Sequence, residues 1–424
     1  MSIDVRAPER REPPASAPVF WTRDRVAQAL GIGPRGNGAF GRVWTDTRTV
    51  QPGDLFVALS GERFDAHDFL AQAVAAGAGG VVVARPDRAA NLGVPVYVVA
   101  HTRLDVHASA ANYNNLVGVP LTLLAIPDHA DIAVVEMGTN QPGEIAALRS
   151  AAEPDIVVVT SIGEEHLEGL GDLAGVMREE LSACDGVRLA VVPASQPEVA
   201  AAAAGRAGRV LTAGLDAGEF KPERWRMEAD GHGVLSMGGV DVRPPARGAH
   251  NLRNAVLALA VADACGVSMA DASRGMAEAE MPAMRAAVDA VGSALLVNDA
   301  YNANPESTLA ALQLLAKVGE GRQRVAVLGS MLEMGGHSAR VHDAVALAAL
   351  SSPVELLVGI GEFAAAFGRA GAPASRVITA PDVASAWSAL ALRLQPNAAI
   401  LLKGSRGVRL ERLVPAVAQW AGAD

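Results

Sequence analysis

Residues 155–171 read DIVVVTSIGEEHLEGLG, an apolar, β-branched run that passes directly into a polar, acidic loop. Such a run is typical of a strand in a parallel sheet that is buried on both faces. Comparable runs, separated by Ala-rich helical stretches, occur at 54–59, 80–84, 94–99, 131–137, 187–193, 293–299, 323–330, 354–360 and 398–405. The alternation predicts an α/β fold built on parallel sheets. Ligands bind beyond the carboxyl ends of strands in such sheets, so the polar residues after each run are candidate site residues.

The composition of the chain excludes several classes of protein. Its 424 residues include 36 Lys or Arg and 46 Asp or Glu, which gives a net charge of −10. An acidic chain without a basic block argues against a general nucleic-acid binder, and two cysteines do not make a disulfide framework. No apolar run approaches the ~18 residues of a membrane span. The charged, Pro-containing N-terminus does not resemble a signal peptide. We therefore expect a cytoplasmic protein and, by default, a monomer.

The length predicts several domains, at about 100–200 residues for each. We expect a flexible tail at 1–17 and a first domain at 18–100. A second domain is expected at 101–281 and a third at 282–424, with a hinge at the Pro-containing segment 280–285.

The first domain has two polar loops next to its expected strands. Asp46, Thr47 and Arg48 precede the run at 54–59, and Asp65 and His67 follow it. Such loops suit the recognition of a polar ligand. Turn formation and helix capping by Asp and Thr also explain them, and both interpretations stay open.

The second domain has an acidic residue and a histidine after adjacent runs. Glu136 ends the run at 131–137, and His166 lies among glutamates just beyond the run at 155–163. A carboxylate and an imidazole at neighbouring strand ends could hold Mg²⁺ and phosphate. Acidic residues also favour a helix start through the macrodipole. Asn114 and Asn115 could bind a polar ligand or make a turn.

Further candidates lie at the start of the expected helix at 248–262 and after the strands of the third domain. The amide of Asn254 could recognise an adenine edge, although Asn is also a common helix cap. Asp299 ends a strand, where an acidic residue could accept a ribose hydroxyl. Lys403 and Arg406 after the last run form a compact anion-binding group.

Eight segments, in this order, resemble the Mur ligase family over residues 20–418. They are DTRTVQPGDLFVAL, NYNNLVGVPLTLL, EMGTNQPGEIAAL, TSIGEEHLEGLG, HNLRNA, DAYNANPES, VLGSMLEMG and LLKGSRG. The resemblance implies a UDP-binding domain, a central ATPase domain and a Rossmann-like C-terminal domain. The tyrosine-containing DAYNANP segment points to the members that add D-alanyl-D-alanine to UDP-N-acetylmuramoyl-tripeptide. That reaction consumes ATP with Mg²⁺ and passes through an acyl phosphate.

The resemblance also assigns roles to residues. It implies that Glu136, His166, Lys403 and Arg406 are catalytic, and that Mg²⁺ is held by Glu136, His166 and Glu180. ATP contacts are implied for Asn254, Arg285, Asp299 and Asn302. The UDP-linked substrate is matched to Asp46, Thr47, Arg48, Asn114 and Asn115.

The family's phosphate-binding loop, GxxGK[ST] between a strand and a helix, is missing from this sequence. The chain has three lysines, Lys221, Lys317 and Lys403, and none follows a glycine. The segment after residue 103 passes directly into sequence that resembles the part beyond that unit. We infer that a strand, loop and helix of roughly 30 residues or more are missing. The neighbouring strands must then pair with each other or leave backbone groups unpaired.

A second departure is Glu180, which matches a position where family members have a lysine, carbamylated in several of them. Four interpretations follow from these features. The chain could be an active ligase, a pseudoenzyme that only binds the UDP-muramoyl peptide, or a truncated or engineered form of an active enzyme. It could also be another amide ligase on the same scaffold, such as a folate-tail enzyme, although the DTR and DAYNANP segments match that class poorly.

Overall fold

The computed structural model of the protein describes residues 21–30, 38–59, 65–98, 105–110 and 112–422. The chain divides into two compact units. The first comprises Met1–Asp105 with Cys265–Val267, and the second comprises Val106–Ala264 with Ser268–Asp424. The expected tail at 1–17 and the expected boundary at 100 lie outside the described residues. The expected domain boundaries at 100 and at 281 stay predictions. None of the described helices is long and apolar enough to cross a membrane.

The first unit is a parallel sheet with an apolar cluster on each face. Its strands pair in the order β1 (Val43–Trp44), β2 (Leu55–Val57), β3 (Gly80–Val83) and β4 (Val96–Val98). Its helices are α1 (Arg23–Ala29), the 3-10 helix η1 (Ala66–Phe69), α2 (Leu70–Ala75) and the 3-10 helix η2 (Pro86–Ala89). Val81 and Val82 follow each other in β3 and lie in different clusters, as the alternation of a strand requires.

The N-terminal part of the second unit contains three separate sheets. The parallel pairs are β5 (Val106–Ala108) with β6 (Ile132–Val134), and β7 (Ile156–Val158) with β8 (Leu189–Pro193) and β9 (Val210–Ala213). An antiparallel sheet, which the sequence did not predict, consists of β10 (Arg224–Met227), β11 (Gly233–Met237) and β12 (Val240–Val242). The helices are α3 (Gly118–Leu124), α4 (Glu144–Ala152), α5 (Leu167–Leu170), α6 (Leu173–Glu180), η3 (Leu181–Cys184), α7 (Pro197–Ala203), α8 (Ala249–Ala264) and α9 (Met269–Ala277).

The parallel sheet of this part is interrupted between β6 and β7. Among the described residues, β6 hydrogen-bonds only to β5 and β7 only to β8. The expectation of strands buried on both faces is therefore wrong here. Ala133 and Val134 point to opposite faces of β6, and both are exposed. The strands next to the missing unit have not paired with each other, so they leave edge groups open.

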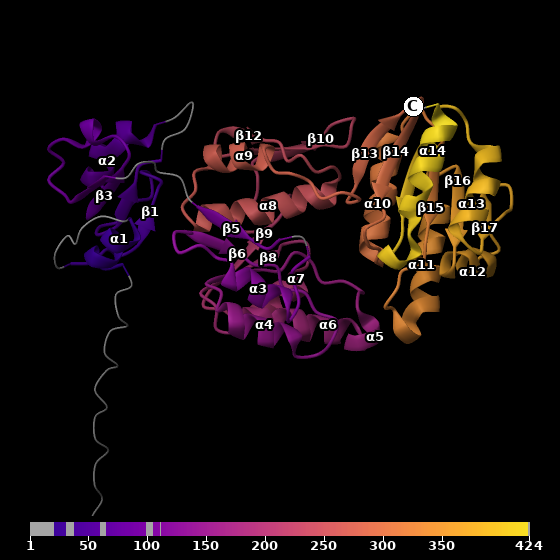
Figure 1. Cartoon of the computed structure of the whole chain (residues 1–424), viewed down its shortest axis with the longest axis horizontal. Coiled ribbons are helices and arrows are strands. Elements are labelled where there is room, and N and C mark those ends of the chain that lie inside the picture. Colours follow the sequence, from indigo (N-terminus) through magenta and orange to yellow (C-terminus); the bar gives the residue numbers. More distant parts are fainter. Residues whose placement is uncertain (1–20, 31–37, 60–64, 99–104, 111, 423–424) are drawn as a thin grey trace, which may run out of the picture. The chain divides into compact units, whose positions relative to one another are not determined.

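The C-terminal part has a six-stranded sheet with helices on both faces (Figure 1). Its order is β13 (Ala287–Val291), β14 (Ala294–Asp299), β18 (Ala399–Lys403), β15 (Arg324–Leu328), β16 (Leu356–Ile360) and β17 (Val377–Ala380), with only β13 antiparallel. The helices are α10 (Pro305–Val318), η4 (Gly335–His337), α11 (Ser338–Ser351), α12 (Glu362–Arg369), α13 (Val383–Leu390), η5 (Ala391–Arg393), η6 (Arg406–Val408), η7 (Leu410–Leu413) and α14 (Val414–Ala421). Helices α10, α11 and α12 share one apolar cluster with this sheet, and α13 and α14 share another.

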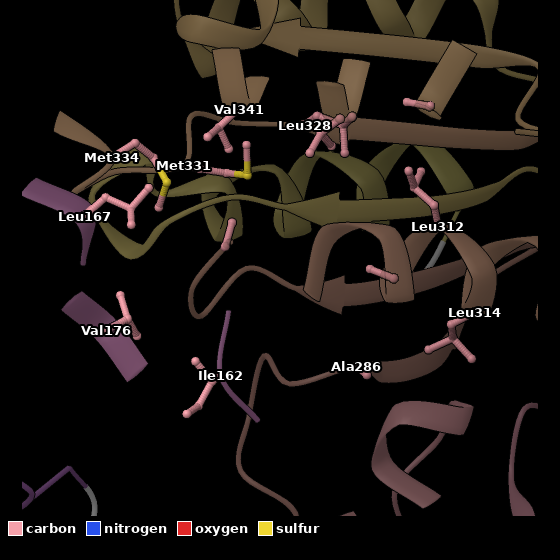
Figure 2. Packing of buried hydrophobic residues seen from close by; sticks show 14 of the residues in the cluster. Ile162, Leu167, Val176, Ala286, Leu312, Leu314, Leu328, Met331, Met334 and Val341 are labelled. Carbon is pink, nitrogen blue, oxygen red and sulfur yellow. The ribbon is translucent and has the colours of Figure 1, made fainter. Parts of the chain in front are cut away.

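One apolar cluster continues from the C-terminal sheet into the part around β7 and α6. It contains Leu328, Met331 and Met334 from the former, and Leu167 and Val176 from the latter. Figure 2 shows Leu167 beside Met334 and Met331, with Val176 close by. This shared core fixes the loop after β7 next to the loop after β15, which positions the candidate site.

Candidate functional site

A cavity of about 110 Å³ lies where four loops of the second unit meet. Each loop follows the carboxyl end of a parallel strand: β7, β14, β15 or β18. Its lining includes His166, Asn302 and Arg406, three residues that the sequence identified. Their meeting agrees with the rule that ligands bind beyond the carboxyl ends of such strands.

His166 is held by a partner that the sequence analysis missed. The Nδ1 atom of His166 lies 2.6 Å from Oε2 of Glu333. Both residues have left-handed backbone conformations, with φ of 53° for His166 and 64° for Glu333. Non-glycine residues in this region cost of order 1–3 kcal/mol each, and such strain gathers at functional sites. Glu333 follows the run at 323–330, and this position is the sequence signal that could have identified it.

Polar contacts fix the loop of His166 against the C-terminal part. The Nδ2 of Asn304 donates to Oε2 of Glu165 at 3.1 Å, and the guanidinium of Arg340 pairs with Glu164 at 2.5 Å. The backbone N–H of Glu168 donates to the carbonyl of Glu333 at 3.0 Å. These contacts join residues more than a hundred positions apart, so no local sequence pattern indicates them.

Lys403 and Asp299 form an ion pair at the end of neighbouring strands. The Nζ of Lys403 lies 2.7 Å from Oδ2 of Asp299, and their Cα atoms are register partners of β18 and β14. The other carboxylate oxygen accepts the N–H of Ala286 at 3.0 Å. The side chains are only 4% and 13% exposed. Burial lowers the pKa of Lys403, and the charge of Asp299 acts in the opposite direction.

Two further titratable side chains interact with this pair. The guanidinium of Arg285 lies 4.2 Å from the ring centroid of Tyr301, and its charge acts on Lys403. Burial lowers the pKa of His250, which also responds to the charges of Asp299 and Lys403. His250 lies in the first turn of α8, so the start of this helix lies near the pair.

Glu136 and the two asparagines lie near each other, at the end of β6 and the start of α3. The Nδ2 of Asn114 donates to Oε1 of Glu136 at 3.0 Å. Asn115 instead accepts the N–H groups of Val117 and Gly118, so it makes the turn that begins α3. Asn254 is exposed on α8.

The neighbouring glutamates of α6 have different environments. Burial, together with the charge of Glu165, raises the pKa of Glu180 to about 7, while His166 acts in the opposite direction. Glu179, which the sequence analysis passed over, accepts the N–H groups of Gly143 at 2.7 Å and Ile145 at 2.8 Å. It therefore stabilises the start of α4. In the described part of the chain, no three His, Cys, Asp or Glu side chains converge as a metal cluster.

In the first unit, the candidates Asp46 and Arg48 are paired with each other. The Nη2 of Arg48 lies 2.7 Å from Oδ2 of Asp46, and the Arg48 N–H donates to Oδ1 at 3.0 Å. The hydrogen bond from Arg48 lowers the pKa of Asp46. Thr47 lies half-buried between them. This is turn chemistry, and it also presents a guanidinium that is 68% exposed.

The second polar loop of the first unit is a compact network. The buried ring of His67 lies with Nδ1 2.5 Å from Oδ1 of Asp65, and its Nε2 accepts the N–H of Ala84 at 2.9 Å. Asp65 also pairs with Arg85 at 2.9 Å. Burial opposes ionisation of Asp65, but these hydrogen bonds outweigh it and lower its pKa to about 2. Asp65 caps η1, as the capping interpretation of this loop predicted.

Three family models match the chain. The Mur ligase family catalytic domain matches residues 41–130, the Mur ligase middle domain matches 88–262, and the Mur ligase glutamate ligase domain matches 284–406.

Curated and solved relatives agree with these matches. The UDP-N-acetylmuramoyl-tripeptide–D-alanyl-D-alanine ligase of Escherichia coli (strain K12) is 30% identical over 88% of this chain and 93% of the relative. The crystal structure of MurF from Acinetobacter baumannii is 26% identical, covers 94% of this chain and 99% of that one, and has a TM-score of 0.68. Folylpolyglutamate synthase of Mycobacterium tuberculosis, solved in complex with ADP and AMPPCP, is 25% identical over 68% of each chain, with a TM-score of 0.53.

The alignment with the Escherichia coli relative also bears on the missing segment. The alignment has 426 positions and covers 88% of this chain's 424 residues, which is about 373 residues. About 50 positions of the relative therefore have no counterpart in this chain. The expected three-domain α/β architecture is confirmed by the three matched models and the solved relative. The chain belongs to the Mur ligase family.

Proposed function

We propose that this protein serves the ATP-dependent ligation of D-alanyl-D-alanine to UDP-N-acetylmuramoyl-tripeptide. The observation that carries the proposal is the resemblance to a ligase of that name along 93% of its length. A folate-type ligase is less favoured, because the similarity to folylpolyglutamate synthase covers 68% of that chain. We propose that the protein acts as a cytoplasmic monomer in the synthesis of peptidoglycan precursors.

The proposed reaction joins a carboxylate and an amine. ATP phosphorylates the tripeptide carboxylate, the dipeptide amine attacks the acyl phosphate, and ADP and phosphate leave. Charge stabilisation and positioning dominate such a reaction. Arg406 would stabilise negative charge at the cavity, and Asn302 would position a polar group there. Lys403, which is buried in its ion pair with Asp299, would add positive charge nearby. The complex of folylpolyglutamate synthase with ADP and AMPPCP supports a nucleotide as substrate.

The remaining roles are proposals of the same kind. Both oxygens of Asp299 are engaged by protein donors, yet each carboxylate oxygen can accept a second hydrogen bond, which leaves room for a ribose hydroxyl. Arg285 would contact phosphate and Asn254 adenine. In the first unit, Asp46, Thr47 and Arg48 would contact the uridine nucleotide. Asn114 and Asn115 are likewise proposed as contacts of the UDP-linked substrate.

Mg²⁺ would be held by Glu136, His166 and Glu180. In the described part of the chain these side chains do not converge as a metal cluster, so the assignment rests on the family resemblance. Burial and the charge of Glu165 raise the pKa of Glu180. A cation beside these carboxylates would favour their ionised forms. When bound, the ion would neutralise charge on the transferred phosphoryl group.

The residues of this chain do not provide the phosphate cradle that ATP needs. No lysine precedes residue 221, and no GxxGK[ST] segment exists in the sequence. Losing one charge-stabilising group of this type costs about 10³–10⁵ in rate in related chemistry. We therefore propose that the chain alone binds the UDP-muramoyl tripeptide and couples ATP very slowly. A protein that only binds this peptide is the second candidate, and the interrupted sheet favours it.

Two measurements on the purified chain test these proposals. Calorimetry with UDP-N-acetylmuramoyl-tripeptide should detect binding, and Arg48→Ala should weaken it, with Arg88→Ala as a control at another exposed arginine of the first unit. Phosphate release with ATP, tripeptide and D-alanyl-D-alanine should be barely above background. A turnover of about one per second or more, typical of enzymes, would exclude the binding-only candidate. Absence of tripeptide binding would exclude both candidates.

A further inference from the structure

The exposed apolar side chains of this protein are concentrated around the interruption of the sheet. Fifteen large apolar side chains of the described residues are exposed, and eight of them lie between residues 106 and 158. They are Val106, Tyr113, Leu116, Val117, Leu121, Leu124, Val134 and Val158. A segment of about an eighth of the chain thus carries more than half of them. Such a concentration marks an interaction surface.

The interruption leaves β6 and β7 each with an open edge. The loop after β6 reaches the helices that follow β7, because Thr139 Oγ1 lies 3.5 Å from Glu179 Oε1 on α6, and a Cβ on Gly169 of α5 would meet the carbonyl of Asn140. Within the described residues, no hydrogen bond joins β6 to β7. The unused backbone groups of β6 and β7 can therefore bind an additional strand.

Each open edge favours a strand that continues its sheet in the same sense. β6 pairs in parallel with β5, and β7 pairs in parallel with β8, so an added strand of that sense is parallel to its neighbour. A parallel strand needs a crossover, usually through a helix. Leu121 and Leu124 on α3, which are 48% and 84% exposed, provide an apolar face for such a helix.

Charge determines the chemistry of the connecting loop. The carboxyl end of the inserted strand would lie beside the ends of β6 and β7, which carry Glu136, Glu164 and Glu165. A cationic loop would be favoured at this end, and an acidic one would be repelled.

We propose that the surface between β6 and β7, with the exposed face of α3, binds a separate polypeptide segment consisting of an apolar strand, a cationic loop and a helix. The Escherichia coli relative carries about 50 positions that this chain lacks, 426 aligned positions against about 373 residues here, which is enough for such a unit. Binding is a property of this surface and does not require the ligase reaction.

The probe is a fluorescent peptide with the residues of the Escherichia coli relative that have no counterpart in this chain. Anisotropy titration into the intact protein, without nucleotide, should give saturable one-to-one binding. Val134→Asp and Val158→Asp should each raise the Kd by about tenfold or more, because a charge would enter the buried strand interface. Leu392→Asp is the matched control, since Leu392 is 88% exposed and lies in the C-terminal part. It should leave the Kd unchanged.

Hydrogen exchange gives a second readout that does not depend on any variant. Amides of β6 and β7 should become protected on peptide binding, and those of the edge strand β13 should not. Lack of binding, binding that both Asp variants leave unchanged, or protection elsewhere would overturn the proposal. Self-association of the chain that Val134→Asp abolishes would assign the surface to a second copy and would also overturn it. Binding of the peptide without phosphate release would support the docking site, and it would count only against the proposed reaction.

Discussion

His166 and Glu333 hold each other across 2.6 Å, and each adopts a left-handed backbone conformation. A carboxylate next to Nδ1 selects the tautomer that carries its proton there, which leaves Nε2 free as an acceptor or metal ligand. We expect the ¹⁵N spectrum of the wild-type protein above pH 8 to show His166 with a protonated Nδ1. In Glu333→Ala, the tautomer with a protonated Nε2 should become dominant.

His232 provides the internal control for this measurement. Its Nδ1 lies 2.8 Å from Asp230, so its tautomer should not change in Glu333→Ala. An unchanged His166 spectrum in the variant would mean that Glu333 does not select the tautomer, and the carboxylate would then have a purely structural role.

The Lys403–Asp299 pair should contribute strongly to stability. Removing one partner of a buried pair leaves an uncompensated charge, which costs about 3–5 kcal/mol. We expect Lys403→Met and Asp299→Asn each to lower the free energy of unfolding by that amount in urea titrations. The control is Glu355→Gln, because the Arg324–Glu355 pair is more exposed and should cost less than about 1 kcal/mol. Equal costs for the two pairs would contradict the expectation.

The strands of the sheets could be predicted because each buried run is encoded locally. The run at 398–405 corresponds to β18, and that at 293–299 to β14. Their pairing, and hence the meeting of Lys403 with Asp299, depends on register across 104 residues, which no local pattern specifies. The antiparallel sheet of β10, β11 and β12 was missed, because its short strands lack a continuous apolar run.

The residues of the candidate site were also predicted only where the local sequence indicates them. His166, Asn302 and Arg406 were identified because each follows a strand run, and the structure brings them to one cavity. Glu333 and Glu179 were missed. Their partners come from segments that approach them only in the folded chain, 167 and 34–36 residues away.

Glu179 should contribute to the stability of the fold. Its carboxylate accepts two backbone N–H groups at the start of α4 and is only 7% exposed. Hydrogen bonds to charged groups contribute about 1.5–3 kcal/mol. Glu179→Ala should therefore lower the free energy of unfolding by about 2–3 kcal/mol. Glu280→Ala, at an exposed position, is the control and should change it by less than about 0.5 kcal/mol.

Asp65 should make the first unit sensitive to acid. Its pKa is about 2 in the folded protein, against an ordinary value of 3.8. A lowered carboxyl pKa contributes stability above the ordinary value, and this contribution is lost as the pH falls from about 4 through 2. Asp65→Asn should lower stability at pH 6 and flatten its pH dependence in this window. Asp87→Asn, whose side chain is 66% exposed, should do neither. A steep acid transition that persists unchanged in Asp65→Asn would assign the sensitivity to other groups.

Glu180 should have the opposite pH dependence. Its folded pKa is about 7, above the ordinary value of 4.5, so the folded protein retains a proton that the unfolded chain has released. The wild-type protein should therefore lose stability as the pH rises from about 4.5 to 7, by about 3 kcal/mol at the upper end. Glu180→Gln should remove this loss and be more stable than wild type at pH 8, as measured by urea unfolding.

Mg²⁺ should restore wild-type stability at pH 8 but not affect Glu180→Gln, because only the ionised carboxylate binds the ion. Identical pH profiles of the wild-type protein and Glu180→Gln would mean that folding does not raise the pKa of Glu180, so that its carboxylate is ionised at neutral pH.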